Sequence, residues 1–331
     1  MLGLGLASSH APGMWRPVAD WPKGLERQSP EARSHLPHTA RVEMESPELM
    51  ESYIKRFQAA FATLRQQVQA YQPDALIMIG DDQGDMFDLA NNPTFAIYTG
   101  QEPIWGVSAR DPFGTPPDQR TKITFPNHSE LATYILKGLV KKGFDMANAG
   151  KFEPRGNPQR GVSHMVSNLV PEVDPQHEIP LVCLFMNEYF PPLPTAERCA
   201  QLGAALTEIL ADRPERVAIY ASGGLSHFPG EFNAGWIDPA LDHWILERLE
   251  RNDLEALKHL FTFDSINLRS GTGEVRAWIS VAAAMNRPAQ VVEYVPAHCT
   301  LTGCGFVYWP AVESPAVEEA AALAATGRAS H

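Results

Sequence analysis

The sequence predicts an α/β fold, a single domain in which a mostly parallel or mixed central sheet is flanked by helices. Short apolar runs typical of buried strands alternate with longer segments whose apolar residues recur at helical spacing. No internal repeat or linker-like stretch divides the chain. The length of 331 residues is enough for one large domain. Several apolar runs end in glycine-bearing loops that carry His, Asp or Gln, which places the candidate active site on strand-end loops.

The expected elements follow in chain order. Strands are predicted, from first to last, in LGLGLASSH, DALIMIG, TFAIYTG, IPLVCLFMN, RVAIYASGG, VVEYVPAHC and GCGFVYWP. A helix is predicted over Pro47–Tyr71 with Ser46 as its N-cap, and another after Thr195 in the same capping role. Further helices are predicted in HSELATYILKGLVKKG, in residues 238–261 and in EVRAWISVAAAMN.

The remaining segments define the expected domain boundaries. Residues 1–312 are predicted to form one catalytic domain, and residues 313–331 a frayed or disordered tail. Residues 15–48 have little periodicity and are rich in Pro, Arg, Glu and His, which predicts a long surface loop serving as an active-site lid. Residues 101–127 read as a second proline-rich loop.

Composition excludes several classes of protein. The chain has 39 acidic and 27 basic residues, for a formal charge of −12, and it has no basic stripe of the kind that binds nucleic acid. No apolar run approaches the ~20 residues that span a bilayer, so no membrane partner is expected. The first residues lack the basic and apolar regions of a signal peptide. Four cysteines do not form a disulfide scaffold, and a cytoplasmic location is therefore expected.

Four residues in glycine-bearing segments are candidates for chemistry. His10 follows the first predicted strand in SSHAPG, and His227 lies in SGGLSH, where the glycines allow a sharp turn. His164 lies in RGVSHMV, and Glu274 opens a helix in SGTGEVRAW. Each has an ordinary structural explanation when taken alone, such as a helix-dipole contact for Glu274. A serine-hydrolase site at Ser226 is not expected, because no glycine follows the serine at the position that the nucleophile elbow requires.

Taken in chain order, these motifs resemble the class III extradiol ring-cleaving dioxygenases, the family of the protocatechuate 4,5-dioxygenase catalytic subunit and of gallate and 3-O-methylgallate dioxygenases. The resemblance covers SSHAPGM, LIMIGDDQGDMF, VSHMVSNLVP, FMNEYFPPLPTAERCAQLG, ASGGLSHF and EVRAWISVAAAMN, which together span nearly the whole chain. It implies an enzyme that uses Fe(II) and O₂ to open a catechol- or gallate-like ring, possibly methoxylated, beside its diol.

The resemblance also implies residue roles. His10 and Glu274 match iron ligands of a two-His-one-carboxylate site. His227 matches the acid–base histidine, and His164 matches a second active-site histidine that contacts oxygen or the substrate hydroxyl.

One departure from the family pattern leaves the third iron ligand open. The turn that usually carries the second histidine ligand reads Asp81-Asp82-Gln83 here. Either a histidine of the predicted lid supplies the ligand, with His38 preferred over His35, or Gln83 binds the metal or lies just outside its ligands. A third possibility is a metal-poor, non-catalytic relative.

The substrate is expected to be a small aromatic compound. An aromatic acid bound to an acidic protein needs a local positive group, and Arg160 and Arg269 are predicted to supply it, with Gln83 as a further substrate contact. The aromatic residues expected in the pocket wall are Trp15, Trp21, Phe113 and Tyr189. A homo-oligomer is expected, and a separate small helical subunit is a further expected partner. A metal-dependent hydrolase or lyase acting on a phenolic or keto acid is the alternative enzyme.

Overall fold

A computed structural model describes residues 1–26, 45–112, 114–162, 164–229, 231 and 233–312. Ten strands are described in these ranges: β1 (Leu2–Ser8), β2 (Ala75–Gly80), β3 (Phe95–Tyr98), β4 (Ile104–Val107), β5 (Lys122–Phe125), β6 (Ala147–Ala149), β7 (Leu181–Met186), β8 (Val217–Ser222), β9 (Gln290–Ala297) and β10 (Thr302–Trp309). The α-helices are α1 (Trp21–Glu26), α4 (Pro47–Tyr71), α5 (Ser129–Lys141), α6 (His164–Ser167), α7 (Val170–Val173), α8 (Ala196–Leu210), α9 (Pro239–Glu250), α10 (Leu254–Lys258) and α11 (Val275–Met285).

Eight of these strands form one mixed sheet with the order β6-β3-β7-β2-β8-β1-β10-β9. The four central strands β7, β2, β8 and β1 run parallel to one another. On either side of this parallel centre the next strand runs antiparallel: β3 pairs with β7, and β10 pairs with β1. The predicted α/β class with a mixed sheet is therefore confirmed, and the carboxyl ends of four adjacent strands meet at one edge.

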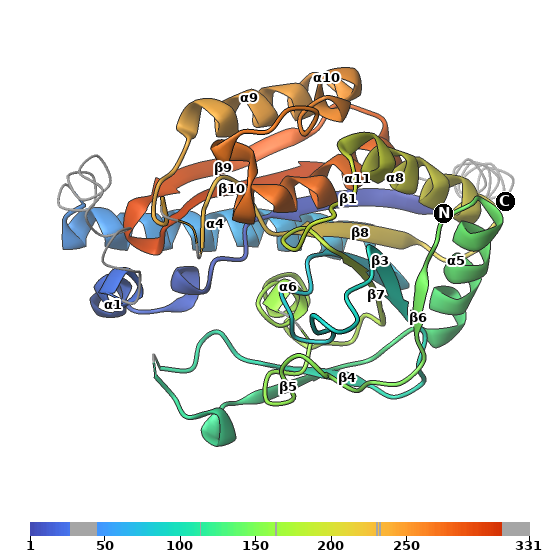
Figure 1. Cartoon of the computed structure of the whole chain (residues 1–331), viewed down its shortest axis with the longest axis horizontal. Helices are drawn as coiled ribbons and strands as arrows, with labels where there is room; N and C mark the ends of the chain where they lie inside the picture. Colours follow the sequence, from blue (N-terminus) through green and yellow to red (C-terminus); the bar gives the residue numbers. More distant parts are fainter. Residues whose placement is uncertain (27–44, 113, 163, 230, 232, 313–331) are drawn as a thin grey trace, which may run out of the picture.

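Helices cover both faces of the sheet, so the chain has three layers. Alternate residues of β2 point to opposite faces: Ile77 belongs to the apolar cluster that includes residues of α5, α8 and α11, whereas Met78 belongs to the cluster that includes residues of α4 and α6. Figure 1 shows α9 and α10 on the opposite side of the sheet from α6 and the β4–β5 hairpin. Because both faces are buried, the central strands are continuous apolar runs rather than alternating ones.

Local sequence signals determine where the long helices begin and end. The Ser46 hydroxyl accepts a hydrogen bond from the Leu49 N–H, and the Thr195 hydroxyl accepts one from the Arg198 N–H, as expected for N-caps. The α4 helix ends at Gln72, which has a left-handed backbone with φ 49°. The cap positions predicted for these two helices are confirmed.

The structure corrects two parts of the sequence interpretation. Residues 101–127 contain the β4–β5 hairpin rather than only a loop. Residues 15–26 of the predicted lid form short helical turns, and Trp21 is buried in the core with Met14. Residues 27–44, with His35 and His38, lie outside the described residues, as do Phe113 and the predicted tail. The lid function stays a prediction.

No helix in the described ranges is long and apolar enough to span a bilayer.

The contact between α8 and α11 depends on one glycine and yields a stability prediction. A Cβ at Gly203 would lie 1.8 Å from the carbonyl oxygen of Ser280. The Gly203→Ala variant must separate the two helices, and we expect the free energy of unfolding to fall by about 1–3 kcal/mol. Denaturant unfolding measures this change. Gly150→Ala is the control, because no atom lies within 4 Å of a Cβ at that position. Equal stabilities of the two variants would contradict the close packing of these helices.

Candidate active site

The candidate site lies where the central parallel strands end. His10 follows β1, Gln83 follows β2, Tyr189 follows β7 and His227 follows β8. Glu274 is the last residue of a 3-10 helix, Ser270–Glu274, that leads directly into α11. Residues far apart in the sequence are therefore brought together by the parallel arrangement of the strands.

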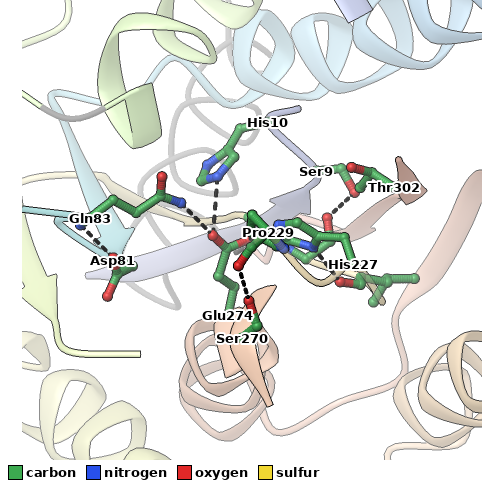
Figure 2. Close-up of polar contacts among 12 residues, drawn as sticks. Ser9, His10, Asp81, Gln83, His227, Pro229, Ser270, Glu274 and Thr302 are labelled. Carbon is green, nitrogen blue, oxygen red and sulfur yellow. Dashed lines mark hydrogen bonds and ion pairs between the residues drawn. The ribbon is translucent and has the colours of Figure 1, made fainter. Parts of the chain in front are cut away.

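Glu274 is the centre of the site. Its side chain is fully buried, and its Oε1 accepts hydrogen bonds from the Gln83 side-chain amide at 2.7 Å and from the Tyr189 hydroxyl at 3.0 Å. The backbone N–H of Gly224 donates to Oε2. Figure 2 shows the carboxylate between Gln83, His10 and His227. Burial alone would raise the pKa of Glu274, but His10, His227 and the Gly224 N–H outweigh it and hold the pKa well below its usual range.

His10 points an unpaired nitrogen at this carboxylate. Its Nδ1 pairs with the Ser222 hydroxyl at 2.8 Å. Its Nε2 is buried, has no hydrogen-bond partner among the described residues, and lies 3.4 Å from Oε1 of Glu274. Where a cation binds both groups, an imidazole nitrogen is expected to face a carboxylate oxygen with no hydrogen bond between the two.

His227 is held in one orientation by its backbone. Its Nδ1–H donates to the carbonyl of Leu225 at 3.0 Å, so Nε2 is the atom left to gain or lose a proton. That Nε2 lies 3.2 Å from the Tyr189 hydroxyl and 3.7 Å from Oε2 of Glu274. Burial first, and then the charge of Glu274, raise the pKa of Tyr189 well above its usual range, so the phenol keeps its proton. Gly271 makes room for the ring, because a Cβ there would lie 2.2 Å from it.

His164 is the fourth predicted residue at the site. It begins helix α6 rather than lying in a loop, and its ring centroid is 4.3 Å from that of His10. The Arg160 guanidinium donates to His164 Nδ1 at 3.0 Å, which places the imidazole proton on Nε2. Burial, together with the nearby His10 and Arg160, lowers the pKa of His164 well below its ordinary value, so the ring is neutral.

These side chains line a cavity of about 290 Å³, which we call the site cavity. Of the residues predicted from sequence, the ones that line it are His10, Gln83, Arg160, His164, Tyr189 and His227. Ala11, Pro12, Pro229 and residues 300–302 complete most of its wall. Glu274 lies beneath it as the shared partner of His10, Gln83 and Tyr189.

Three other predicted contacts are not brought to the site. Arg269 is exposed, and its guanidinium forms a two-point salt bridge with Asp264, at 2.6 Å for the shorter contact, away from the site cavity. Trp15 donates its indole N–H to Glu172, and Trp21 is buried in the core. Asp264, five residues before Arg269, is a local partner for its guanidinium. Closeness in sequence to the site residues therefore does not bring Arg269 to the site cavity.

Sequence reasoning missed several supporting groups. Ser222 orients His10, while Asp81 accepts hydrogen bonds from the backbone N–H groups of Gln83 and Glu188. Asp242, on α9, is fully buried and accepts hydrogen bonds from the backbone N–H and hydroxyl of Ser226, the residue before His227, each at 2.8 Å. The available signal was an acidic residue directly after a buried strand for Asp81. Asp242 has no such local signal, because its partners lie on other elements.

Two side chains of this site are of the types that hold iron in a two-His-one-carboxylate centre. His10 Nε2, which has no hydrogen-bond partner among the described residues, lies 3.4 Å from a carboxylate oxygen of Glu274. Among the described residues, no group of three His, Cys, Asp or Glu side chains is placed to hold a metal. A metal held by His10 and Glu274 would therefore need a third protein ligand of another residue type, such as Gln83, or one from His38 or His35, which lie outside the described residues.

Comparison with known proteins decides the family. A family model described as the catalytic LigB subunit of aromatic ring-opening dioxygenase matches residues 32–307, which is most of the chain. The chain belongs to this family. The resemblance predicted from the sequence motifs is thereby confirmed.

Individual relatives are more distant. A 2,3-dihydroxyphenylpropionate/2,3-dihydroxicinnamic acid 1,2-dioxygenase from Photorhabdus laumondii is 22% identical over 202 residues, covering 60% of this chain and 56% of that protein. A gallate dioxygenase from Pseudomonas putida is 30% identical over 163 residues, covering 48% of this chain and 46% of that protein. The chain thus spans about half the length of the curated relatives it matches.

A solved structure of an uncharacterized Escherichia coli K12 protein aligns with a TM-score of 0.44 at 13% identity, covering 74% of this chain and 91% of that one. These values are too low to support an argument about the site.

The buried Asp242 yields a prediction about stability and pH. Burial raises its pKa to about 7 from an unfolded value near 3.9. Between these values the folded protein binds more protons than the unfolded chain, so this group makes the free energy of unfolding fall as pH rises from 4 to 7. In the Asp242→Asn variant, which has no charge at this position, the free energy of unfolding should fall less steeply as pH rises. The difference is about 1.4 kcal/mol for each unit by which the pKa of Asp242 differs between the folded and the unfolded state.

Denaturant unfolding at pH 5 and pH 8 measures this difference. The exposed Asp118→Asn variant is the control and should keep the slope of the unmodified protein. An unchanged slope in Asp242→Asn would show that Asp242 is ionised throughout this range.

Proposed function

We propose that this protein is a non-haem Fe(II)-dependent extradiol dioxygenase that inserts both atoms of O₂ into a catechol- or gallate-like ring. The observation that carries the proposal is the position of His10 Nε2, which has no hydrogen-bond partner among the described residues, 3.4 Å from the buried carboxylate of Glu274. Family membership supports it, because relatives carry the names of dioxygenases that act on dihydroxyphenyl compounds and on gallate.

His10 and Glu274 are the residues that would hold the iron, with Gln83 or a histidine of residues 27–44 as the third protein ligand. When bound, Fe(II) supplies a Lewis acid and a redox centre at which the diol and dioxygen are brought together. The protein contribution is the buried carboxylate, whose low pKa keeps it anionic without a bound proton.

His227 is the group that moves a proton. Its Nδ1–H is committed to the Leu225 carbonyl and His227 lines the site cavity, so Nε2 accepts a proton from the substrate diol. The Tyr189 hydroxyl at 3.2 Å can accept a hydrogen bond from the imidazolium that results, while Glu274 stabilises its positive charge. The same Nε2 returns the proton when the ring opens.

His164 has a different role because its ring stays neutral. With Nδ1 accepting from Arg160, its Nε2–H is a hydrogen-bond donor at the cavity wall, suited to a substrate or dioxygen oxygen. Arg160 also pairs with Asp85 at 3.4 Å, which holds the guanidinium at this wall.

The reaction is expected to take place in the cytoplasm. All four cysteines are buried free thiols, which supports a reducing compartment. Assembly as a homo-oligomer, and association with a small helical subunit, stay predictions.

Replacement of His227 tests the acid–base role. We expect His227→Ala to retain iron, because two other residues hold it, and to reduce the turnover of a cleaved diol by about 10²–10⁴-fold. Oxygen uptake with a panel of catechols, gallates and methoxylated analogues measures this. The exposed His259→Ala variant is the matched control and should keep full activity.

Full activity in His227→Ala would remove the proposed role. Turnover of the panel without consumption of O₂ would instead favour the metal-dependent hydrolase or lyase.

Metal loading tests the origin of the third ligand. After anaerobic reconstitution with Fe(II), the unmodified protein should hold iron near one per chain. If Gln83 is a ligand, Gln83→Ala should lose more affinity than the roughly 10–100-fold typical of a residue just outside the ligands, and His38→Ala should not. The reverse result would assign the ligand to His38, and His35→Ala is the second comparison. Failure of the unmodified protein to retain iron would favour a non-catalytic binding relative.

A further inference from the structure

A second cavity of about 520 Å³ lies beside the site cavity. We call it the outer cavity. The two share Pro12, Arg160 and His164 in their walls, so they adjoin at these three residues. The outer cavity is lined mainly by residues of the connection between β4 and β5 and by residues between Asn157 and Val162 and between His164 and Asn168, which are distant in sequence from the metal-binding candidates.

The two volumes set the size of molecule that the pair of cavities suits. An apolar cavity of about 150 Å³ holds a benzene ring, so the site cavity of about 290 Å³ has room for one substituted ring. The outer cavity is larger than the site cavity and is not needed for a single-ring diol. The additional space therefore fits a substituent that is itself about the size of a ring.

The chemistry of the outer cavity favours an acidic aromatic substituent. Apolar groups form part of its wall, including Val107, Val162 and four prolines. Arg16, Arg120 and Arg160 also line it, against a single carboxylate from Asp111, so its charge is opposite to the −12 of the whole chain. Uncharged polar side chains, such as Ser108, Asn157 and Asn168, form much of the remaining wall. A wall that combines apolar surface with a few convergent polar and charged groups can orient an organic ligand.

Arg120 is the best placed of these arginines to bind an anion. It is half-buried, its Nε–H donates to the Thr115 carbonyl at 3.3 Å, and it forms no ion pair with a described carboxylate. Arg160, in contrast, already contacts Asp85 and His164. A guanidinium held by one bond and with its other N–H groups available matches a carboxylate in two-point geometry.

We infer that the outer cavity is a second substrate subsite, which binds a carboxylate-bearing ring attached to the diol ring. This inference rests on the proposed function. The preferred substrates are then two-ring diol acids, with the diol ring in the site cavity, the second ring against the proline wall and the carboxylate on Arg120.

The experiment compares four diols: catechol, a dihydroxybenzoate, a neutral dihydroxybiphenyl and a dihydroxybiphenyl whose second ring carries a carboxylate. The iron-loaded protein should give its highest kcat/KM with the biphenyl carboxylate. In Arg120→Gln, the kcat/KM of the biphenyl carboxylate relative to the neutral biphenyl should fall by about 10–100-fold, the range expected for a lost charge-assisted hydrogen bond. In Arg120→Lys, this ratio of kcat/KM values should lie between those of the unmodified protein and of Arg120→Gln, because lysine keeps the charge but lacks the planar fork of the guanidinium.

A matched control separates the subsite from general effects on the fold. The Arg155 side chain is exposed, its ion pair with Glu153 is long at 3.9 Å, and Arg155 is absent from the wall of either cavity, so Arg155→Gln should keep the ratio unchanged. Equal loss for both biphenyls in Arg120→Gln would overturn the inference. A higher kcat/KM for the dihydroxybenzoate than for the biphenyl carboxylate would also overturn it.

A binding measurement keeps this test independent of the proposed reaction. Calorimetric titration of the iron-free protein with the biphenyl carboxylate should show a Kd that weakens by a similar factor in Arg120→Gln. If no diol is cleaved but this difference in Kd is found, the proposed dioxygenase function fails and the subsite stands. If catechol is cleaved and the Kd values are equal, the subsite fails and the dioxygenase function stands.

Discussion

The burial of one negative charge, on Glu274, is the constraint on which the site depends. Moving a carboxylate out of water costs several kcal/mol unless hydrogen bonds and positive charge replace the lost hydration. The protein provides them from three strand ends: the Gln83 amide after β2, the Tyr189 hydroxyl after β7 and the Gly224 N–H after β8. Two imidazoles complete the surroundings. A carboxylate held in this way is ready to bind a cation without first losing a proton.

The same constraint explains the glycines around the carboxylate. A Cβ at Gly223 would lie 2.4 Å from Oε2 of Glu274, and the backbone there has φ 116°, which side-chain-bearing residues rarely adopt. Gly271 has a comparable role toward the His227 ring. The two glycines allow the backbone of separate loops to approach the carboxylate and its histidine closely. The glycine content of these loops therefore follows from the geometry of the site.

Much of the fold, and several of the side chains that meet in the site cavity, could be predicted from the sequence, because their signals are local. Capping by Ser46 and Thr195 and continuous apolar runs mark the helices and central strands. The β4–β5 hairpin was missed because its prolines and charged residues mask the strand pattern. His10, His227, His164 and Gln83 were found by motif and meet in one cavity. Asp242 and Ser222 were not found, since their roles exist only once distant elements pack together. Arg269 was misplaced because its partner, Asp264, is local.

The distribution of charge connects the site to its surroundings. The chain as a whole is acidic, yet Arg120 and Arg160 both face the cavities beside Glu274. This local positive charge attracts an anionic ligand at short distances, because salt screens the attraction beyond the Debye length. Within the site cavity, which Arg160 also lines, the neutral His164 and the protonated Tyr189 provide polar contacts without adding charge. Arg120, the proposed partner of a substrate acid, lies in the outer cavity instead.

The central claim is that His10 and Glu274 together bind the catalytic metal. The most direct measurement is anomalous diffraction at the iron absorption edge from crystals of protein loaded with Fe(II) under anaerobic conditions. The account predicts one strong anomalous peak within bonding distance of His10 Nε2 and the Glu274 carboxylate, about 2.0–2.2 Å from each. A peak bound elsewhere in the chain, or full iron occupancy without contact to both residues, would contradict it.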